Sequence, residues 1–324
     1  MPPPQPPSAT SEAVASPPPA HTRPRPQLAE TTPTARPPGP AWWRVLRTRQ
    51  WTKNLLVLAA PLAAGSLLRV DVALGAGVAL ALFCLASSGC YLVNDVLDAE
   101  QDRRHPVKRT RPVAAGEIGP RAALLAGVAL QTVAIVAGAL WDPALGATMA
   151  AYSITQALYV AGLKHQPPID LAVVASGFLL RAVAGGAATD TRLSTWFLLL
   201  ATFGAFFVVA GKRYSERVQV GSEAGTRPSL RHYSESYLRF VWTMAAGVTV
   251  VVYLLWALTG PHHTGVVPWE GLSVVAFVLG LLRYAARIDQ ATAEHPEDIV
   301  ASDRGLQVVG VIWVLLVLAG AVVE

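Results

Sequence analysis

Oxygen-bearing side chains recur at a helical spacing immediately after a long apolar run of the chain. Asn94, Asp98 and Asp102 stand at positions i, i+4 and i+8, and Asp95 directly follows Asn94. On an α-helix this spacing places the first three along one face. Carboxylates this close repel one another unless a cation lies between them, and Mg²⁺ commonly bridges carboxylates to phosphate oxygens. The spacing therefore indicates that Asn94, Asp95, Asp98 and Asp102 bind a diphosphate through Mg²⁺.

A group of basic residues follows these acids. In the alternative interpretation, the acids belong to a solvated helix end and only pair with these cations. Pro106 and Pro112 interrupt the helix, so the basic loop can fold back over the acidic face. Acids that hold a metal beside bases that hold phosphates are common in sites that move phosphorylated groups. We therefore expect this loop to bind substrate, through Arg103, His105, Lys108, Arg109 and Arg111.

Polar residues also stand at the ends of other apolar runs, where they would share one rim with the acids. For the polar residues before the first apolar run, the alternative is that they only anchor the chain at the cytoplasmic face of the membrane, beside Trp51 at the interface. The candidate substrate-binding residues at these ends are Gln50, Lys53, Tyr159, Lys164, Asp170, Lys212 and Arg213.

Arg181 differs from these residues because it lies in the middle of an apolar run. A charge at that depth of a bilayer costs a few kcal/mol. We therefore expect Arg181 to face the interior of a helical bundle and to have a partner, either in substrate binding or in a structural ion pair.

The apolar runs decide the fold class. The chain has 324 residues, of which 52% are hydrophobic and 15% charged, whereas about a quarter of the residues of a soluble protein are charged. A membrane-spanning helix needs about 20 apolar residues. The sequence predicts an all-α polytopic membrane bundle of about nine transmembrane helices, near residues 54–69, 73–97, 121–140, 144–163, 168–188, 194–211, 238–258, 269–286 and 305–323.

The first 40 residues have a different composition, rich in Pro, Ser and Thr. Such a segment buries too little surface to offset its ordering entropy, so we expect a disordered tail over 1–40 and a transferase domain over 41–324. The tail lacks the apolar region of a cleavable signal peptide. The two cysteines, Cys84 and Cys90, are expected to be small buried hydrophobic residues.

Lys and Arg residues are distributed unequally between the loops on the two sides of the predicted spans. One set of loops holds nearly all of them, and the opposite loops hold only Arg69 and Arg192. The positive-inside rule places the basic set in the cytoplasm. We therefore expect a multi-pass protein of the inner (plasma) membrane with its active site facing the cytoplasm. Nucleic acid is excluded as a partner because the basic loops alternate with the spans, and the oligomeric state, including a homo-oligomer, stays open.

The motif at the end of the second run resembles a known family. Asn94, Asp98 and Asp102, in a bundle of nine spans, are similar to the first aspartate motif of the UbiA superfamily of membrane prenyltransferases, and the resemblance covers about residues 44–324. Most members carry a second motif, Asp-x-x-x-Asp, after the fourth helix. Here the corresponding place has Tyr159 and Lys164, with only Asp170 nearby.

This departure resembles one branch of the superfamily, the decaprenyl-phosphate phosphoribosyltransferases of arabinan precursor synthesis. Segments such as "RTRQWTKNLLVLAAPLAAG" and "LKHQPPIDLAVVASGFLLRAVAGG" are similar to that branch. The resemblance implies 5-phosphoribosyl 1-diphosphate as donor, decaprenyl phosphate as acceptor, Mg²⁺ as cofactor and decaprenylphosphoryl-5-phosphoribose as product. Fewer acids and more bases suit this donor, because it is more anionic than a prenyl diphosphate.

Roles follow from this chemistry. Asp98 and Asp102, with Asn94, are expected to be catalytic by holding Mg²⁺ on the leaving diphosphate. Gln50, Lys53 and Arg181 are the candidates that hold the acceptor phosphate near C1 of the donor. Two alternatives stay open: a prenyltransferase that uses an aromatic acceptor, and a transporter, which would need discontinuous helices near the membrane midplane.

Overall fold

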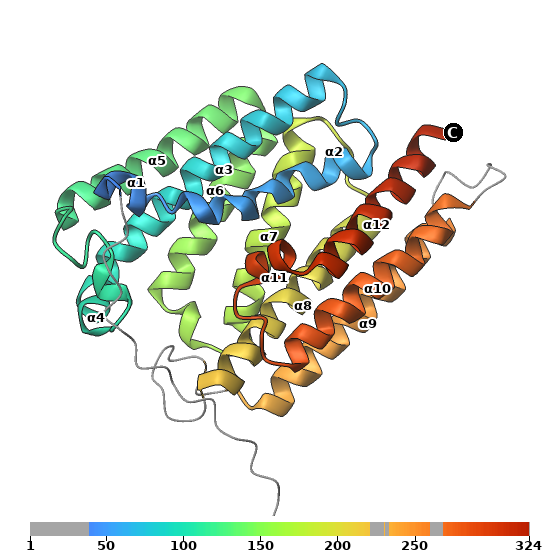
Figure 1. Ribbon diagram of the computed structural model, residues 1–324. Coiled ribbons are helices and arrows are strands. Elements are labelled where there is room, and N and C mark those ends of the chain that lie inside the picture. The colour runs from blue at the N-terminus through green and yellow to red at the C-terminus, as the bar shows by residue number, and fades with distance from the viewer. Residues whose placement is uncertain (1–38, 221–229, 231–232, 260–267, 324) are drawn as a thin grey trace, which may run out of the picture. The chain divides into compact units, whose positions relative to one another are not determined.

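The computed structural model describes residues 39–220, 230, 233–259 and 268–323, and the regular elements in these ranges are all helical. The predicted tail, 1–40, lies outside the described residues except for Gly39 and Pro40. In chain order the helices, with η for 3₁₀ helices, are α1 (Ala41–Val45), η1 (Thr48–Leu58), α2 (Ala59–Ala63), α3 (Val70–Leu97), α4 (Ala99–Arg104), η2 (Lys108–Thr110), α5 (Pro120–Trp141), α6 (Pro143–Ala161), η3 (Leu163–His165), α7 (Ile169–Ala188), α8 (Thr195–Val220), α9 (Glu235–Thr259), α10 (Trp269–Asp289), α11 (Pro296–Ser302) and α12 (Arg304–Val323) (Figure 1).

The all-helical membrane fold predicted from the apolar runs is confirmed, but the count of nine spans is not. In the described part of the chain, six helices are long and apolar enough to cross a membrane: α3, α5, α7, α8, α9 and α10. The helices α6 and α12 occupy two further predicted runs. α6 is not among the six, and the part of α12 that was compared, Arg304–Gly320, is apolar but shorter than a span.

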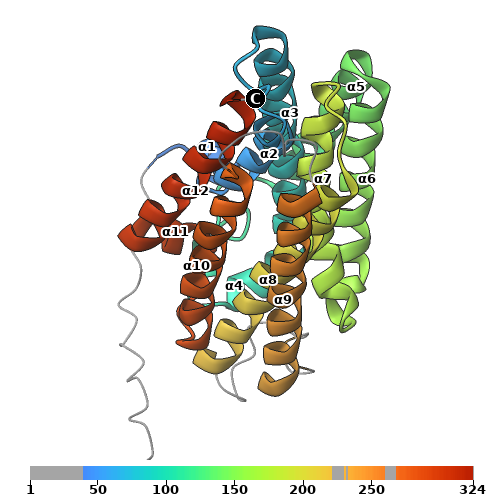
Figure 2. The ribbon, with the colours of Figure 1, turned by 90° about the vertical axis from the view of Figure 1, so that its right-hand side faces the viewer.

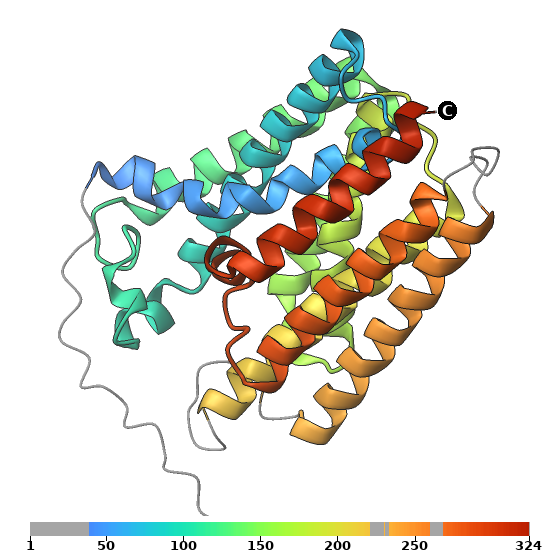
Figure 3. The ribbon, with the colours of Figure 1, turned by 45° about the vertical axis from the view of Figure 1, so that its right-hand side comes forward.

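The first predicted span, 54–69, is wrong as a single helix. The segment is divided into η1, α2 and a turn at Gly65, whose φ is 63°. Pro61 has no backbone N–H, so it cannot bond to the carbonyl of Val57 and extend a helix from η1. The segment therefore lies along the bundle as short helical pieces, drawn in blue in Figure 3.

Neighbouring helices in the sequence are also neighbours in space. The contacts run from α3 to α5, α6, α7, α8, α9, α10 and α12 in turn, while η1 packs on both α3 and α7. Figure 2 shows α5 and α6 at one side of the bundle and α10 with α12 at the other. This order places the C-terminal ends of α3 and α6 close enough to share a site.

Two glycines permit close approaches that position the site. A Cβ on Gly185 would lie 1.9 Å from the carbonyl oxygen of Val57, so η1 can rest on α7 only where α7 has no side chain. A Cβ on Gly89 would lie 2.7 Å from the carbonyl oxygen of Gly127 and 2.9 Å from Cγ of Gln131. The absence of a side chain at Gly89 thus brings α3 onto α5 and leaves room for Gln131.

Candidate active site

The predicted acidic face persists where α3 gives way to α4. Asp98 separates the two helices, yet its amide donates to the carbonyl of Asn94 at 2.9 Å, and the amide of Asp102 donates to the carbonyl of Asp98 at 2.8 Å. Because these bonds keep the i to i−4 pattern, Asn94, Asp98 and Asp102 retain the helical spacing read from the sequence.

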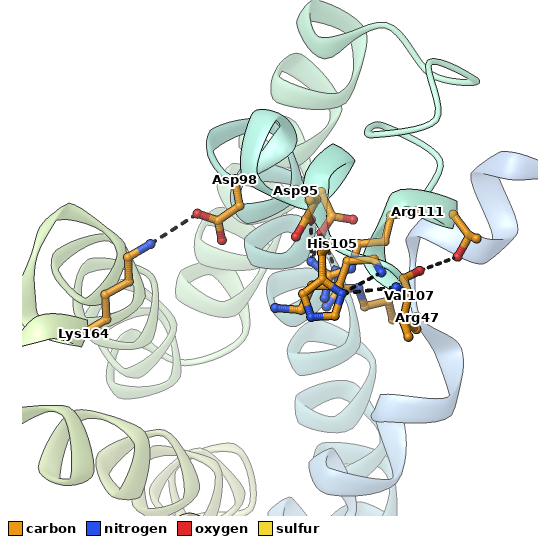
Figure 4. A network of polar contacts seen from close by, with 10 residues as sticks. Arg47, Asp95, Asp98, His105, Val107, Arg111 and Lys164 are labelled. Atoms are coloured by element: carbon orange, nitrogen blue, oxygen red, sulfur yellow. Dashed lines mark hydrogen bonds and ion pairs between the residues drawn. The ribbon is translucent and has the colours of Figure 1, made fainter. Parts of the chain in front are cut away.

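The basic loop folds back over the acids, as the two prolines predicted. Arg111 donates through Nη1 to Oδ2 of Asp102 at 2.7 Å and approaches Oδ1 of Asp95 at 3.4 Å. Arg47, from the turn between α1 and η1, also donates to Asp95 (Figure 4). Asp95 and Asp102 are buried, so these pairs compensate charges that water does not reach.

Lys164 reaches the same acids from the other side. Its Nζ lies 3.2 Å from Oδ1 of Asp98, and Figure 4 shows the side chain extending from η3, just after α6, toward the end of α3. Both side chains are about one-third exposed, at 27% and 34%. The residue that replaces an acid in the second motif therefore contacts the first motif directly.

The side chains around Asp95 offer oxygen atoms to a divalent metal. In the described ranges no three His, Cys, Asp or Glu side chains lie close enough together to hold one. The donor chemistry nevertheless fits a hard cation, because Oδ2 of Asp95 is buried without a hydrogen-bond partner and the other predicted ligands also offer oxygen. The ligand set Asn94, Asp95, Asp98 and Asp102 stays a prediction.

His105 shapes the basic loop through its ring. Nδ1 accepts hydrogen bonds from the amides of Val107 at 3.2 Å and Lys108 at 3.3 Å. Burial lowers the pKa of His105, and the nearby Lys108 lowers it further. Both effects disfavour the charged imidazolium, and Nδ1 accepts from the loop backbone. Arg103 donates to the carbonyl of Ala114, and Arg109 is exposed.

A second charged cluster lies where α6, α7 and α8 meet. Asp170 is fully buried and accepts hydrogen bonds from Tyr233 and, at 3.4 Å, from Arg213. Arg213 also contacts Glu216 at 3.2 Å and the hydroxyl of Tyr159 at 3.4 Å. Burial and the bond to Asp170 raise the pKa of Tyr233. These groups contact one another inside the protein, while Nε of Arg213 is buried without a hydrogen-bond partner. The substrate-binding role of Asp170 and Arg213 stays a prediction.

The neighbouring predicted residues have local partners. Lys212 donates to the carbonyl of Glu294 at 2.6 Å, which ties α8 to the segment after α10. Lys53 donates to Gln50 at 2.6 Å within η1.

Arg181 faces the bundle interior and has partners, as expected. It donates to Oδ1 of Asn54 at 2.8 Å and to the carbonyl of Gly177 at 2.6 Å, and its guanidinium lies over the rings of Phe83, Tyr152 and Phe178. Among the ion pairs of the described residues, none involves Arg181. Amide, carbonyl and aromatic groups therefore hold this cation, rather than the ion pair considered from the sequence.

A cavity of about 360 Å³ opens beside the Lys164–Asp98 pair, between α3, α5 and α6. Aliphatic side chains, Cys90 and small residues form part of its wall. Its polar lining consists of Asn94, Asp98, Gln131, Ser153, Gln156 and Lys164. Sequence reasoning missed Gln131, Ser153 and Gln156, although an amide such as Gln131 in the middle of an apolar run is itself a sign of function.

Sequence reasoning also missed Arg47 as a partner of the acids. It was counted only among the loop cations that orient the protein. Burial lowers the pKa of Arg47, and the attraction of Asp95 opposes that shift. No local pattern could have paired these residues, because the contact joins positions 48 apart in the chain.

Comparison with known proteins shows the family and the fold of the chain. A family model described as the UbiA prenyltransferase family matches residues 55–301. The chain belongs to this family. Solved structures agree at the level of the fold: the UbiA homolog from Archaeoglobus fulgidus bound to GPP and Mg²⁺ has a TM-score of 0.68 and 18% identity, over 87% of this chain and 98% of that one. A digeranylgeranylglyceryl phosphate synthase structure has a TM-score of 0.65 and 15% identity, over 88% and 98%.

Curated relatives within the family are more similar in sequence. A decaprenyl-phosphate phosphoribosyltransferase of Mycolicibacterium smegmatis is 45% identical over 88% of this chain and 94% of its own. The enzyme of the same name from Mycobacterium tuberculosis is 44% identical over 85% of this chain and 92% of its own. The one from Corynebacterium glutamicum is 43% identical over 85% of this chain and 84% of its own.

Proposed function

We propose that this UbiA-family chain transfers 5-phosphoribose from phosphoribosyl diphosphate to a polyprenyl phosphate, with decaprenyl phosphate as the expected acceptor. The names of relatives 43–45% identical over most of both chains support the reaction. One geometric observation supports it most directly: Lys164 lies 3.2 Å from Asp98, so the altered second motif adds a cation to the acidic face. A donor that carries three phosphate groups needs such added positive charge.

The cations at this face are already beside the acids that would hold the donor's metal. Arg111, Arg47 and Lys164 each contact one or two of Asp95, Asp98 and Asp102. Phosphate oxygens that enter the site would accept charge-assisted hydrogen bonds from these guanidinium and ammonium groups, in place of the carboxylates. The acids would then be released as oxygen ligands.

Asn94, Asp98 and Asp102, with Asp95, would hold Mg²⁺ at the diphosphate. Bound there, Mg²⁺ would neutralise the charge that develops on the leaving diphosphate. The acceptor phosphate is ionised at neutral pH and needs no strong general base. Its oxygen forms the new bond to C1 while the bond from C1 to the diphosphate oxygen breaks, and attack from the opposite side inverts C1.

The acceptor phosphate requires positioning more than activation. Gln50 and Lys53, which lie on η1, are our candidates for holding it. Arg181 is the third candidate, although its Nε and Nη1 already donate to Asn54 and Gly177. The reaction would take place at the cytoplasmic face of the inner membrane, in a transferase domain covering 41–324.

The test is a transfer assay with the full chain in membranes. Label from phosphoribosyl diphosphate should enter the lipid fraction only when polyprenyl phosphate is present, and EDTA should abolish the transfer. Asp98→Asn should lower turnover by more than the roughly 10–100-fold typical of losing a supporting residue around a metal. Consumption of a prenyl diphosphate with an aromatic acceptor would instead identify the prenyltransferase alternative, and vectorial solute uptake would identify the transporter.

A further inference from the structure

We propose that the cavity between α3, α5 and α6 binds the pentose ring of the donor, with Gln131, Ser153 and Gln156 recognising its hydroxyl groups. This inference rests on the proposed function and names the part of the substrate that the cavity takes. The residues come from two different helices and line one cavity of about 360 Å³.

The cavity is charged at one end and neutral along the rest of its length. Asp98 and Lys164 form an ion pair at the ends of α3 and α6. From Asp98 the lining continues along α3 to Cys90, eight residues earlier, which is about 12 Å on a helix. Asp98 and Lys164 are the only charged groups among its lining residues, so the inner part suits an uncharged portion of the ligand.

One inner polar group, the Ser153 hydroxyl, is available to a ligand, and two amides lie near it in the same lining. Oγ of Ser153 is buried and has no hydrogen-bond partner. Ser153 and Gln156 stand at i and i+3 on α6, so they share a face. Gln131 lies beside Gly89 of α3, whose missing side chain makes room for it. A buried hydroxyl without a partner is costly, and a ligand that bonds to it recovers that cost.

The chemistry favours a sugar over a lipid tail. Amides and hydroxyls donate to and accept from ribose hydroxyls, while the aliphatic part of the wall can pack on the carbon face of the ring. An isoprenoid chain in the same place would leave the Ser153 hydroxyl without a partner and put aliphatic groups against the two amides. The position beside Asp98 also places a pentose next to the diphosphate that the acids are proposed to hold.

The experiment compares near-isosteric apolar variants with a matched control. Gln131→Met, Ser153→Ala and Gln156→Met each remove one neutral hydrogen bond, and each should raise KM for phosphoribosyl diphosphate about two- to tenfold. Thr132→Val is the control, because Thr132 is the exposed neighbour of Gln131 on the same helix. Inhibition by inorganic diphosphate, which carries no pentose, should stay unchanged in all variants.

Donor analogues without the 2- or 3-hydroxyl give a second measurement. The wild type should prefer the ribosyl donor over at least one of them, and the matching variant should lose that preference. Size-exclusion elution at the wild-type volume verifies that each variant is folded.

Three outcomes would overturn the proposal. Unchanged donor KM with a retained preference would remove the pentose from this cavity. A raised KM for polyprenyl phosphate, with donor KM unchanged, would assign the cavity to the lipid acceptor. Absence of label transfer by the wild type would overturn the proposed function itself, and the pentose site with it.

Discussion

At the scale of single residues, each acid of the first motif is matched with a cation from elsewhere in the chain. Asp95 contacts Arg47 and Arg111, Asp102 contacts Arg111, and Asp98 contacts Lys164. The side chain of Asp98 is the most exposed of these three acids. Lys164 can therefore exchange Asp98 for a phosphate at little cost in free energy.

Lys164→Ala should weaken use of the phosphoribosyl donor by roughly ten- to a hundredfold, because one charge-assisted contact is worth about 1.5–3 kcal/mol. Lys164→Asp should weaken it further by adding repulsion. Steady-state kinetics with varied donor measure both effects, and saturating lipid acceptor should rescue neither. Arg104→Ala serves as control, since Arg104 is exposed and pairs with Glu100 one turn away. Wild-type donor kinetics in Lys164→Asp would show that the loop does not line the site.

At the scale of helices, buried polar contacts join elements that the membrane alone would leave free to slide. Asp170 of α7, Arg213 of α8 and Tyr233 before α9 form one buried cluster. Arg283 and Arg287 of α10 hold Asp303 at 2.7 and 2.8 Å, at the start of α12. Each cluster fixes the end of a helix relative to its neighbours.

Arg213→Met should destabilise the protein by about 3–5 kcal/mol, because it leaves the buried carboxylate of Asp170 without its cation. The double variant Asp170→Asn/Arg213→Met should lose less than the sum of the single changes. Thermal unfolding in detergent measures the three variants. A variant of normal stability with a raised donor KM would instead support the phosphate-binding role predicted for Arg213 from the sequence.

The ion pairs of Asp303 predict that the contact between α10 and α12 is less stable at acid pH. The amide of Leu306 first, and then Arg287 and Arg283, hold the pKa of Asp303 well below its usual value of 3.8. A carboxyl with a depressed pKa contributes stability that is fully present above the unfolded pKa and is lost as the pH falls through the folded one. Thermal stability should therefore be independent of this group at neutral pH and decrease below about pH 4. In Asp303→Asn the decrease should be smaller, and an unchanged acid limb would refute the linkage.

At the scale of the whole molecule, the distribution of basic residues predicts which end of the bundle faces the cytoplasm. The acidic face and its cations lie near the end of α3, and Arg69 lies at the start of the same 28-residue helix. A helix of that length spans about 42 Å. The two ends of α3 should therefore be reached from opposite sides of the membrane.

Arg104→Cys and Arg69→Cys test this orientation. Both native cysteines are buried, so an impermeant maleimide should react mainly with the introduced thiol. Arg104→Cys should be labelled in inside-out vesicles, and Arg69→Cys in right-side-out vesicles or spheroplasts. Labelling of both from the same side would contradict the predicted topology, and permeabilised membranes provide the control for reactivity.

The sequence by itself determined the properties that depend on neighbouring residues. Apolar runs predicted α3 and α5 to within a few residues, because a helix satisfies its own backbone hydrogen bonds in lipid. The i, i+4, i+8 spacing predicted one acidic face, and the structure retains it through the bonds from Asp98 and Asp102. The same local reasoning failed for 54–69, where Pro61 and Gly65 divide the segment.

Tertiary structure alone decided which distant groups meet. Lys164 and Asp98 are 66 positions apart, and no periodicity relates them. Arg181 was expected to have a partner, but Asn54, 127 positions away, could be identified only once η1 packed on α7. The cavity at Gln131 likewise exists because Gly89 lets α5 approach α3, a packing property that neither segment encodes alone.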